Sequence, residues 1–410
     1  MKIAKSVLCA TLIGTALAVA TLGHAETGDI DLITAGYASG RAVGGNTAFI
    51  PESLSDDGRF VLFFSNSGEL VPNDANGHED LFVRDRVSGK TTQVNVSSSG
   101  AVANGPLGAA SISGDGRYVV FASPATNLVP DDTNGKVDIF LRDLQNGTTT
   151  RVSLAASGGQ GNGHSNAPTV STDGRYVAFT SGSSNLVNHV QAGIFVRDRL
   201  TQRTAFVRGS AYGYCTNARI SGNGRYVAFE CPWHPRQFAD EGHGNYNIYL
   251  EDLDSGAVQV VSATNRQTRL TDISDDGRYV AYFSQPGELF QAYLFDRLSR
   301  RREIVSLSTK DKPGNLHSFN PTVSDDGRYV AFESWAGNLV ADDPNLQEPD
   351  IFVRDRQLGK TRRVSVGPPV VRFQPSSLSG DGRIVLFATN GRLTASDTSD
   401  DPYDLYTREL

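Results

Sequence analysis

Basic residues are in deficit in this sequence. The 38 Lys and Arg residues are outnumbered by 45 Asp and Glu residues, which gives a formal net charge of −7. Nucleic-acid phosphates require clustered Lys and Arg, so this balance argues against a nucleic-acid partner. Hydrophobic residues make up 39%, and counting the 42 Gly while leaving out the 14 Tyr gives about 46%. That is the share of an ordinary folded chain, which excludes global disorder.

The familiar catalytic motifs are also missing. The chain contains no Gly-x-Ser-x-Gly nucleophile elbow, no His-Glu-x-x-His zinc motif and no phosphate-binding loop. It has no Cys-x-x-Cys pair either, which argues against a redox thiol. We therefore assign no catalytic residue from the sequence.

Long hydrophobic runs are confined to the first residues. Lys2 and Lys5 precede an apolar stretch from Val7 to Leu22, and Gly23-His24-Ala25 places small residues where a signal peptidase cuts. This pattern predicts a signal peptide at residues 1–25 that is cleaved after Ala25. No later stretch reaches membrane length, so we expect an exported protein, periplasmic or extracellular, that does not span the membrane.

Only two cysteines follow the predicted cleavage site. Cys215 and Cys231 lie on either side of Gly222-Asn223-Gly224, a tight-turn sequence. Two strands joined by that turn would place the two cysteines opposite each other, within reach of a disulfide. An exported chain with an even cysteine count supports the same prediction.

One phrase recurs seven times along the chain. It reads Ser-x-Asp/Asn-Gly-Arg-aromatic-Val-x-Phe with small variations, and its copies follow one another at intervals of 50 to 58 residues. The recurring Asp-Gly or Asn-Gly between apolar runs is a strong hairpin signal. The turn glycines of the seven copies are Gly58, Gly116, Gly174, Gly224, Gly277, Gly327 and Gly382.

Each repeat unit holds four short β patterns. Strand a leads into the Asp-Gly turn and strand b leaves it; strand c is a Phe-Val-Arg-Asp type run, as at 80–86, and strand d a Thr-x-x-Val type run, as at 91–96. No helical period is present after residue 25. Four-stranded repeats of this kind predict a single all-β domain over residues 26–410, a seven-bladed β-propeller with four antiparallel strands in each blade.

The two ends of the chain complement each other. The chain stops at residues 404–409, which is strand c of the last unit, so strand d of that unit is missing. Residues 29–36 provide a spare strand of the same type near the N-terminus. We expect this N-terminal strand to close the last blade, because six or eight blades would leave an exposed strand edge.

The repeat resembles the TolB-type, WD-repeat-like propeller family of exported bacterial proteins. The resemblance rests on the Ser-x-Asp-Gly-Arg-Tyr-Val-Ala-Phe phrase followed by Asp-Ile-Phe-Val-Arg-Asp, and it covers residues 29–410. It implies a propeller fold. From the sequence we expect neither the additional N-terminal domain of TolB itself nor a following peptidase domain.

Charged residues recur at two positions of each unit. The Arg after the turn glycine recurs in all seven units, and an acid ends strand c in each one. Both positions belong to turns on the same rim of a propeller, so we interpret them as charge-assisted hydrogen bonds that fix the blades. The acids are Asp85, Asp143, Asp198, Asp252, Asp296, Asp355 and Glu409.

Acidic residues are closely spaced in several b–c loops. Hard cations such as Ca²⁺ take several oxygen ligands from such spacing, but the bidentate Glu that ends a standard calcium loop is absent. Two interpretations stay open, a Ca²⁺ site and an Asx turn that leads into strand c. The candidate ligands are Asp74, Asn76 and Asp80 in the first unit and Asp132, Asn134 and Asp138 in the second.

Aromatic and histidine residues gather in connections that share the opposite face. The b–c loop of the fourth unit is the richest in aromatic and histidine residues. By resemblance to some other propellers, a metal-dependent lyase site would need three histidines that converge. We expect a binding surface on this face, with Trp233, His234, His243, Tyr246 and Trp335 as candidates.

The sequence therefore favours a non-enzymatic binding or scaffold module of the cell envelope or exterior, with a protein or glycan partner and no cofactor other than Ca²⁺. The first alternative is a lyase or hydrolase that acts on an extracellular polymer through the loop between Trp233 and His243. The second is a TolB-like role in envelope maintenance. An enzyme would need His or acid side chains within a few ångströms of one another at the channel mouth.

Overall fold

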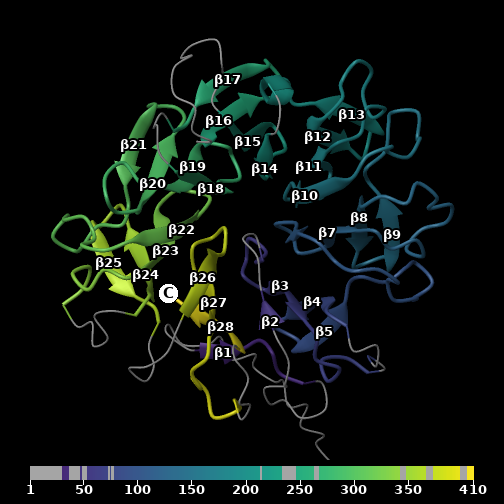
Figure 1. Ribbon diagram of the computed structural model, residues 1–410. Coiled ribbons are helices and arrows are strands. Elements are labelled where there is room, and N and C mark those ends of the chain that lie inside the picture. Colours follow the sequence, from purple (N-terminus) through teal and green to yellow (C-terminus); the bar gives the residue numbers. More distant parts are fainter. Residues whose placement is uncertain are drawn as a thin grey trace, which may run out of the picture.

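Seven four-stranded antiparallel sheets stand as blades around a central axis (Figure 1). The computed structural model describes residues 30–36, 47–48, 53–72, 74, 78–212, 215–232, 246–262, 267–341, 348–365, 373–397 and 404–410. The predicted signal peptide, residues 1–25, lies outside them. No helix of the described residues is both long and apolar enough to cross a membrane.

Within each blade the strands follow the order a, b, c and d from the axis to the periphery, as the sequence predicts (Figure 1). The a strands are β2 (Thr47–Ala48), β6 (Ala110–Ile112), β10 (Ser165–Val170), β14 (Thr216–Ile220), β18 (Thr268–Ile273), β22 (Ser318–Val323) and β26 (Phe373–Leu378). The b strands are β3 (Phe60–Ser65), β7 (Tyr118–Ser123), β11 (Tyr176–Ser181), β15 (Tyr226–Pro232), β19 (Tyr279–Ser284), β23 (Tyr329–Ser334) and β27 (Ile384–Thr389).

The outer half of each blade is formed by strands c and d. The c strands are β4 (Asp80–Asp85), β8 (Asp138–Asp143), β12 (Gly193–Asp198), β16 (Tyr246–Asp252), β20 (Gln291–Asp296), β24 (Asp350–Asp355) and β28 (Asp404–Glu409). The d strands are β5 (Lys90–Gln93), β9 (Thr148–Arg151), β13 (Arg203–Phe206), β17 (Ala257–Val260), β21 (Arg301–Ile304), β25 (Lys360–Arg363) and β1 (Ile30–Leu32).

The N-terminal strand closes the seventh blade, as predicted. Strand β1 pairs antiparallel with β28, with Ile30 opposite Arg408 and Leu32 opposite Tyr406. The hydroxyl of Thr34 then donates a hydrogen bond to Asp404 at 2.6 Å. Ser153 makes the same contact with Asp138 in the second blade, so β1 takes the full role of a d strand.

A cross-strand aromatic pair forms the centre of every blade. In the second blade, Phe121 of strand b lies opposite Phe140 of strand c, with ring centroids 5.8 Å apart. Such directly opposed rings on one face of a sheet stabilise the strand pairing. The other pairs are Phe63–Phe82, Phe179–Phe195, Phe229–Tyr249, Tyr282–Tyr293, Phe332–Phe352 and Phe387–Tyr406.

Neighbouring blades contact each other through the Asp-Gly turns. Gly174 has a φ of 70°, which an Asp-Gly turn needs, and a Cβ at this position would overlap the ring of Tyr118 in the preceding blade. The recurring glycine therefore serves the turn and the packing between blades at once. The aromatic residue after the Arg recurs because it covers the next glycine.

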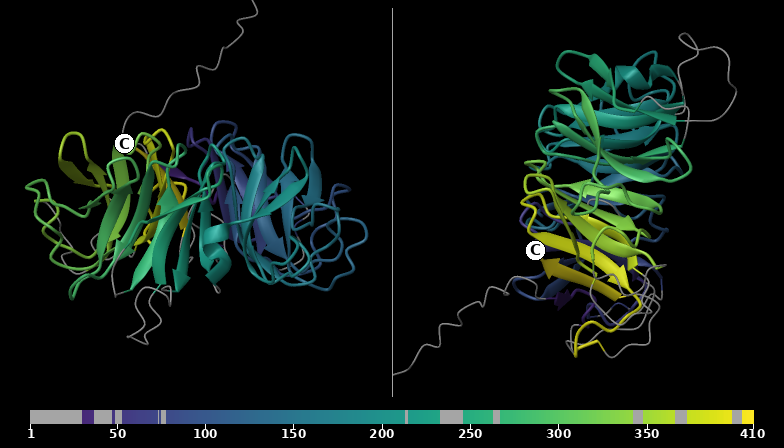
Figure 2. Two further views of the ribbon diagram at one scale, coloured as in Figure 1. Left: turned by 90° about the horizontal axis from the view of Figure 1, so that it is seen from above. Right: turned by 90° about the vertical axis from the view of Figure 1, so that its left-hand side faces the viewer.

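The two faces of the disc differ in their connections (Figure 2). Because strands alternate in direction, the a–b turns of all seven blades and the c–d turns of the first six emerge on one face, which we call the turn face. The b–c and d–a connections emerge on the opposite, loop face. One short 3₁₀ helix that the sequence did not predict, η1 (Arg208–Tyr212), precedes the fourth blade.

Candidate functional site

Arginine–aspartate pairs occupy the rim of the turn face. Arg278 donates to Asp296 through Nε at 3.2 Å and through Nη2 at 3.0 Å, and it lies over the ring of Tyr279. The hydrogen bonds from Arg278 hold the pKa of Asp296 down at about 2. The same pair joins strands b and c in five further blades, as Arg59–Asp85, Arg117–Asp143, Arg175–Asp198, Arg225–Asp252 and Arg328–Asp355.

The rim pairs form within blades, and the seventh blade departs from the pattern. There Arg383 lies 3.8 Å from Asp381 in its own turn. A bidentate guanidinium–carboxylate pair that recurs in most blades fixes the turn geometry. We therefore assign these charges to the scaffold, as the sequence predicts.

The variable residue of the Ser-x-Asp-Gly phrase lies at the axis of the turn face. The seven copies of this position line one end of the central channel, where a cavity of about 80 Å³ is found. Sequence reasoning missed this position, because the motif was read through its recurring residues. The residues are Asp56, Gly114, Thr172, Gly222, Asp275, Asp325 and Gly380.

Three of these residues bring carboxylates together. Asp56, Asp275 and Asp325 come from the first, fifth and sixth blades, and each offers an oxygen that lies within 4.8 Å of the others. The hydroxyl of Thr172 donates to Asp275 at 2.9 Å. Among the described residues, no Lys, Arg or His forms an ion pair with any of the three acids.

Burial and mutual repulsion change how these acids titrate. Burial first, and then the charges of Asp275 and Asp325, raise the pKa of Asp56 to about 8. Burial and the charge of Asp275 raise the pKa of Asp325 to about 7. Acids that lack a basic partner in a confined site are characteristic of functional positions.

The loop face carries a half-buried aromatic cluster between the fifth and sixth blades. The ring of Phe319 lies 5.2 Å from Phe290 and 5.4 Å from Phe283, and His317 stacks on Phe319 at 5.7 Å. Trp335 continues from this cluster, because its backbone N–H donates to the carbonyl of His317 at 3.0 Å. With 43% of its surface exposed, Trp335 is available to a partner.

An acid lies beside this aromatic cluster. Glu333 is opposite Phe319 in the β22–β23 pairing, and Asn320 donates to its carboxylate at 3.3 Å. Burial raises the pKa of Glu333 above its ordinary value. The matching residue of the fourth blade, Glu230, is neutralised by Arg269 at 3.0 Å.

One of the other four candidates of the predicted binding face lies among the described residues. Tyr246 begins β16 and is half-buried, whereas Trp233, His234 and His243 lie outside the described residues. His317 uses Nδ1 to accept a hydrogen bond from the backbone of Phe290 at 3.1 Å. Among the described histidines no three converge on a metal-binding position.

The acids of the b–c loop in the second blade form ion pairs with an arginine from strand d. Arg151 of strand β9 lies 3.1 Å from Asp132 and 3.7 Å from Asp138. Asn134 donates to Asp138 at 2.8 Å and accepts a hydrogen bond from the backbone of Lys136, which is an Asx turn. Calcium binding at this loop stays a prediction.

The corresponding loop of the first blade is described only in part. Asp80 begins β4, is buried, and accepts a hydrogen bond from Asn95 at 2.5 Å. Asp74 is half-buried in the loop, and Asn76 lies outside the described residues. Asp80 and Asp138 therefore take the same structural role, as acceptors for the residue that follows strand d.

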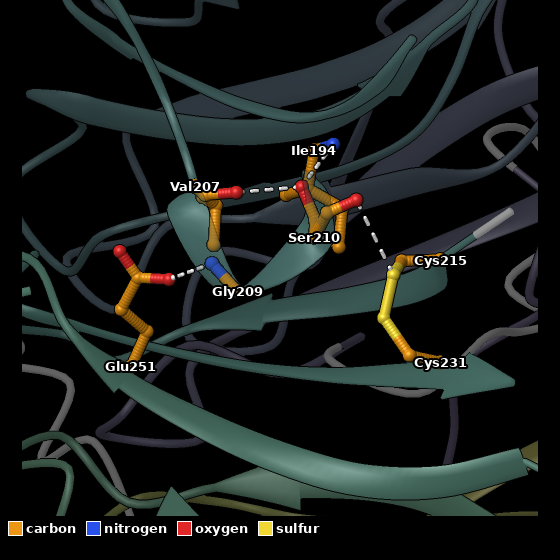
Figure 3. Close-up of a disulfide and its surroundings, with 7 residues drawn as sticks. All are labelled: Ile194, Val207, Gly209, Ser210, Cys215, Cys231 and Glu251. Carbon is orange, nitrogen blue, oxygen red and sulfur yellow. Dashed lines mark hydrogen bonds between the residues drawn. A yellow bond between two sulfur atoms is a disulfide. The ribbon is translucent and has the colours of Figure 1, made fainter. Parts of the chain in front are cut away.

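The predicted disulfide joins strands a and b of the fourth blade (Figure 3). Cys215 and Cys231 are bonded, with Cα atoms 4.2 Å apart, just beyond the paired residues Thr216 and Glu230. Both cysteines are buried. A disulfide indicates an oxidising compartment, which agrees with an exported protein.

The fourth blade has an acid at a strand c position where five other blades have an arginine. In the second blade Arg142 of strand c donates to the carbonyl of Ser97 at 3.2 Å, in the connection before that blade. In the fourth blade this connection is η1, which presents N–H groups instead. Glu251 stands in place of the Arg and accepts from the backbone of Gly209 at 2.7 Å (Figure 3).

Several solved structures share this fold at low sequence identity. The β-propeller domain of the Trilobed protease from Pyrococcus furiosus has a TM-score of 0.57 at 12% identity, covering 89% of this chain and 95% of that chain. The oligogalacturonate lyase from Vibrio parahaemolyticus has a TM-score of 0.55 at 12% identity, covering 94% and 97%. A putative TolB from Agrobacterium tumefaciens matches at 16% identity with a TM-score of 0.43, covering 75% and 91%.

The likenesses to the Trilobed protease domain and to the oligogalacturonate lyase establish the fold and nothing finer. No family model matches the sequence, and no curated protein matches it. The seven-bladed propeller expected from the repeat is confirmed, while membership of the TolB-type repeat family stays a prediction.

Proposed function

We propose that this chain is an exported, TolB-like propeller that acts as a non-enzymatic binding or scaffold module for a protein or glycan partner, in the periplasm or outside the cell. One observation carries the proposal: the loop face presents Trp335 beside the cluster of Phe283, Phe290, His317 and Phe319. Aromatic side chains that are part apolar and part polar are enriched where proteins bind partners.

Strands of two blades support this surface. The aromatic cluster is held by strands of the fifth and sixth blades and not by loops alone, since Phe283 belongs to β19 and Phe319 to β22. Binding groups that are fixed before the partner arrives lose little conformational entropy on binding.

The experiment compares three forms of the protein purified from an oxidising compartment. The wild type, Trp335→Ala and a control, Leu358→Ser, are immobilised and exposed to envelope extract, culture supernatant and a polysaccharide panel. Leu358 is 61% exposed and lies in a c–d turn of the opposite face. A ligand retained by the wild type and Leu358→Ser but lost by Trp335→Ala supports the proposal; equal retention by all three contradicts it.

An enzyme that acts on an extracellular polymer is the second candidate. Glu333 favours it, because a half-buried carboxyl with a raised pKa beside an exposed tryptophan suits a general acid. The fold is also shared with a protein described as oligogalacturonate lyase. Polysaccharide cleavage that Glu333→Gln abolishes, without loss of binding, would replace the binding module with an enzyme.

A further inference from the structure

The axial cavity of the turn face concentrates negative charge without a basic neighbour. Asp56, Asp275 and Asp325 meet there from three blades. The Thr172 hydroxyl donates to Asp56 and Asp275, and the backbone of Asp275 donates to Asp325. The other groups that act on these carboxylates are acids, namely the three themselves and Asp57, Asp276 and Asp326. Charges brought together in a partly desolvated site need a compensating cation or proton.

A buried hydroxyl without a partner lines the same cavity. Thr322 is 4% exposed, and its Oγ1 has no hydrogen-bond partner among the described residues. The matching side chains of two other blades are satisfied: Thr169 accepts from the backbone of Ile220 at 3.1 Å, and Asp272 from that of Val323 at 2.8 Å. A buried hydroxyl that has no protein partner and lines a polar cavity is in a position to bind an ion or a water molecule there.

The three axial carboxylates occupy space that is free because the neighbouring residues are glycines. A Cβ at Gly114 would overlap the carboxylate of Asp56, a Cβ at Gly222 would overlap Asp275, and a Cβ at Gly380 would overlap Asp325. Each of the three acids therefore has a glycine beside it in the ring, which leaves the acids room to converge on one small space. That space, about 80 Å³, is large enough for an ion with water.

We propose that this cavity binds one hard divalent cation, with Asp56, Asp275 and Asp325 as carboxylate ligands and the Thr322 hydroxyl as a further oxygen donor. Calcium bonds to oxygen at about 2.4 Å, so two ligands of one ion are separated by at most about 4.8 Å. The three carboxylates meet that limit, since their ligand oxygens all lie within 4.8 Å of one another. Oxygen-only donors select Ca²⁺, Mg²⁺ or Mn²⁺ over softer metals.

The bound ion would tie the first blade to the fifth and sixth across the axis. This role is independent of the partner proposed for the loop face, because the two sites lie on opposite faces. It is also separate from calcium binding in the b–c loops, where Arg151 already lies beside Asp132.

The test is calorimetric titration of the protein with Ca²⁺, Mg²⁺ and Mn²⁺ after removal of metal by chelation, with melting curves for each state. The axial variants are Asp56→Asn and Asp325→Asn, which keep the side-chain volume. The matched control is Asp254→Asn, an acid that is 75% exposed on the same face. A further variant, Asp132→Asn, tests whether the metal binds in the b–c loop of the second blade.

The expected result is one ion bound per chain with a rise in Tm. Both axial variants should weaken binding by about tenfold or more and lose the rise, while Asp254→Asn and Asp132→Asn keep both. Thr322→Val should weaken binding by a smaller factor. Binding that is lost in Asp132→Asn but kept in Asp56→Asn would place the ion in the loop and overturn the proposal, as would no binding of any of the three metals.

Discussion

The rim and the axis of the turn face use the same residue type in opposite ways. At the rim, aspartates such as Asp296 pair with an arginine, and their pKa values fall. At the axis, Asp56 and Asp325 have only acids and hydroxyl or amide groups around them, and their pKa values rise to about 8 and about 7. The acid that recurs in nearly every blade is thus a scaffold element with an arginine partner, whereas the acid found in only three blades lies among other acids at the proposed metal site.

The largest effect is expected at a turn glycine. Gly174→Ala should destabilise the protein by about 3 kcal/mol, because alanine is strained at a φ of 70° and its Cβ would overlap Tyr118. The control is Gly135→Ala, where φ is 61° but nothing lies within 4 Å, and only about 1 kcal/mol should be lost. Urea unfolding measures both; equal losses would show that packing between blades contributes nothing.

Replacing an axial glycine should lower the free energy of unfolding by less than replacing a turn glycine. Gly222→Ala faces no φ penalty, but its Cβ would overlap Asp275 and Thr172, so we expect a loss of about 2 kcal/mol. Gly159→Ala, whose Cβ would be 3.6 Å from its nearest neighbour, should change stability by less than about 0.5 kcal/mol. A neutral Gly222→Ala would mean that the axial carboxylates readily move aside.

The sequence predicted the blades far better than the axial site. Blade number, strand order, the closing strand and the Cys215–Cys231 bond follow from local signals: repeat spacing, Asp-Gly turns and cross-strand opposition. The axial acids could not be recognised as a group, because 50 to 269 residues separate them and only ring closure brings them together. Their one sequence signal was position, since all three stand between the Ser and the Asp of the repeat.

Tertiary context also explains the residues that the repeat pattern did not. Glu251 breaks the strand c pattern because η1 presents N–H groups where other blades present carbonyls. The acids of the b–c loop in the second blade suggested a calcium site. In the fold, Arg151 of strand d lies beside them. The spacing of acids along a sequence can suggest a metal site. It cannot show that folding places a basic side chain beside those acids.

Removing one axial charge should stabilise the metal-free protein. In chelator at pH 8, Asp56→Asn takes one carboxylate from three that repel one another, and we expect a gain of about 1 kcal/mol. Asp254→Asn, exposed at the rim, should change stability by less than about 0.5 kcal/mol. Chemical denaturation in chelator checks this, and a loss of stability in Asp56→Asn would mean that the axial carboxylates attract a partner more strongly than they repel each other.

The smallest effect is expected where one rim pair is broken. Arg278→Gln should cost about 0.5 to 1 kcal/mol at pH 7, since Asp296 keeps its hydrogen bonds from the backbone of the c–d turn. The pKa of Asp296 is about 2 in the folded protein, below the ordinary value of 3.8. A carboxyl whose folded pKa is lowered contributes stability above its unfolded pKa and loses it as the pH falls through the folded value.

The difference in the free energy of unfolding between wild type and Arg278→Gln should therefore be full above about pH 4 and shrink toward pH 2. High salt should reduce this difference as well. Urea unfolding across this pH range measures the difference, and one that did not change with pH would assign the role of Arg278 to its packing on Tyr279 and not to the ion pair.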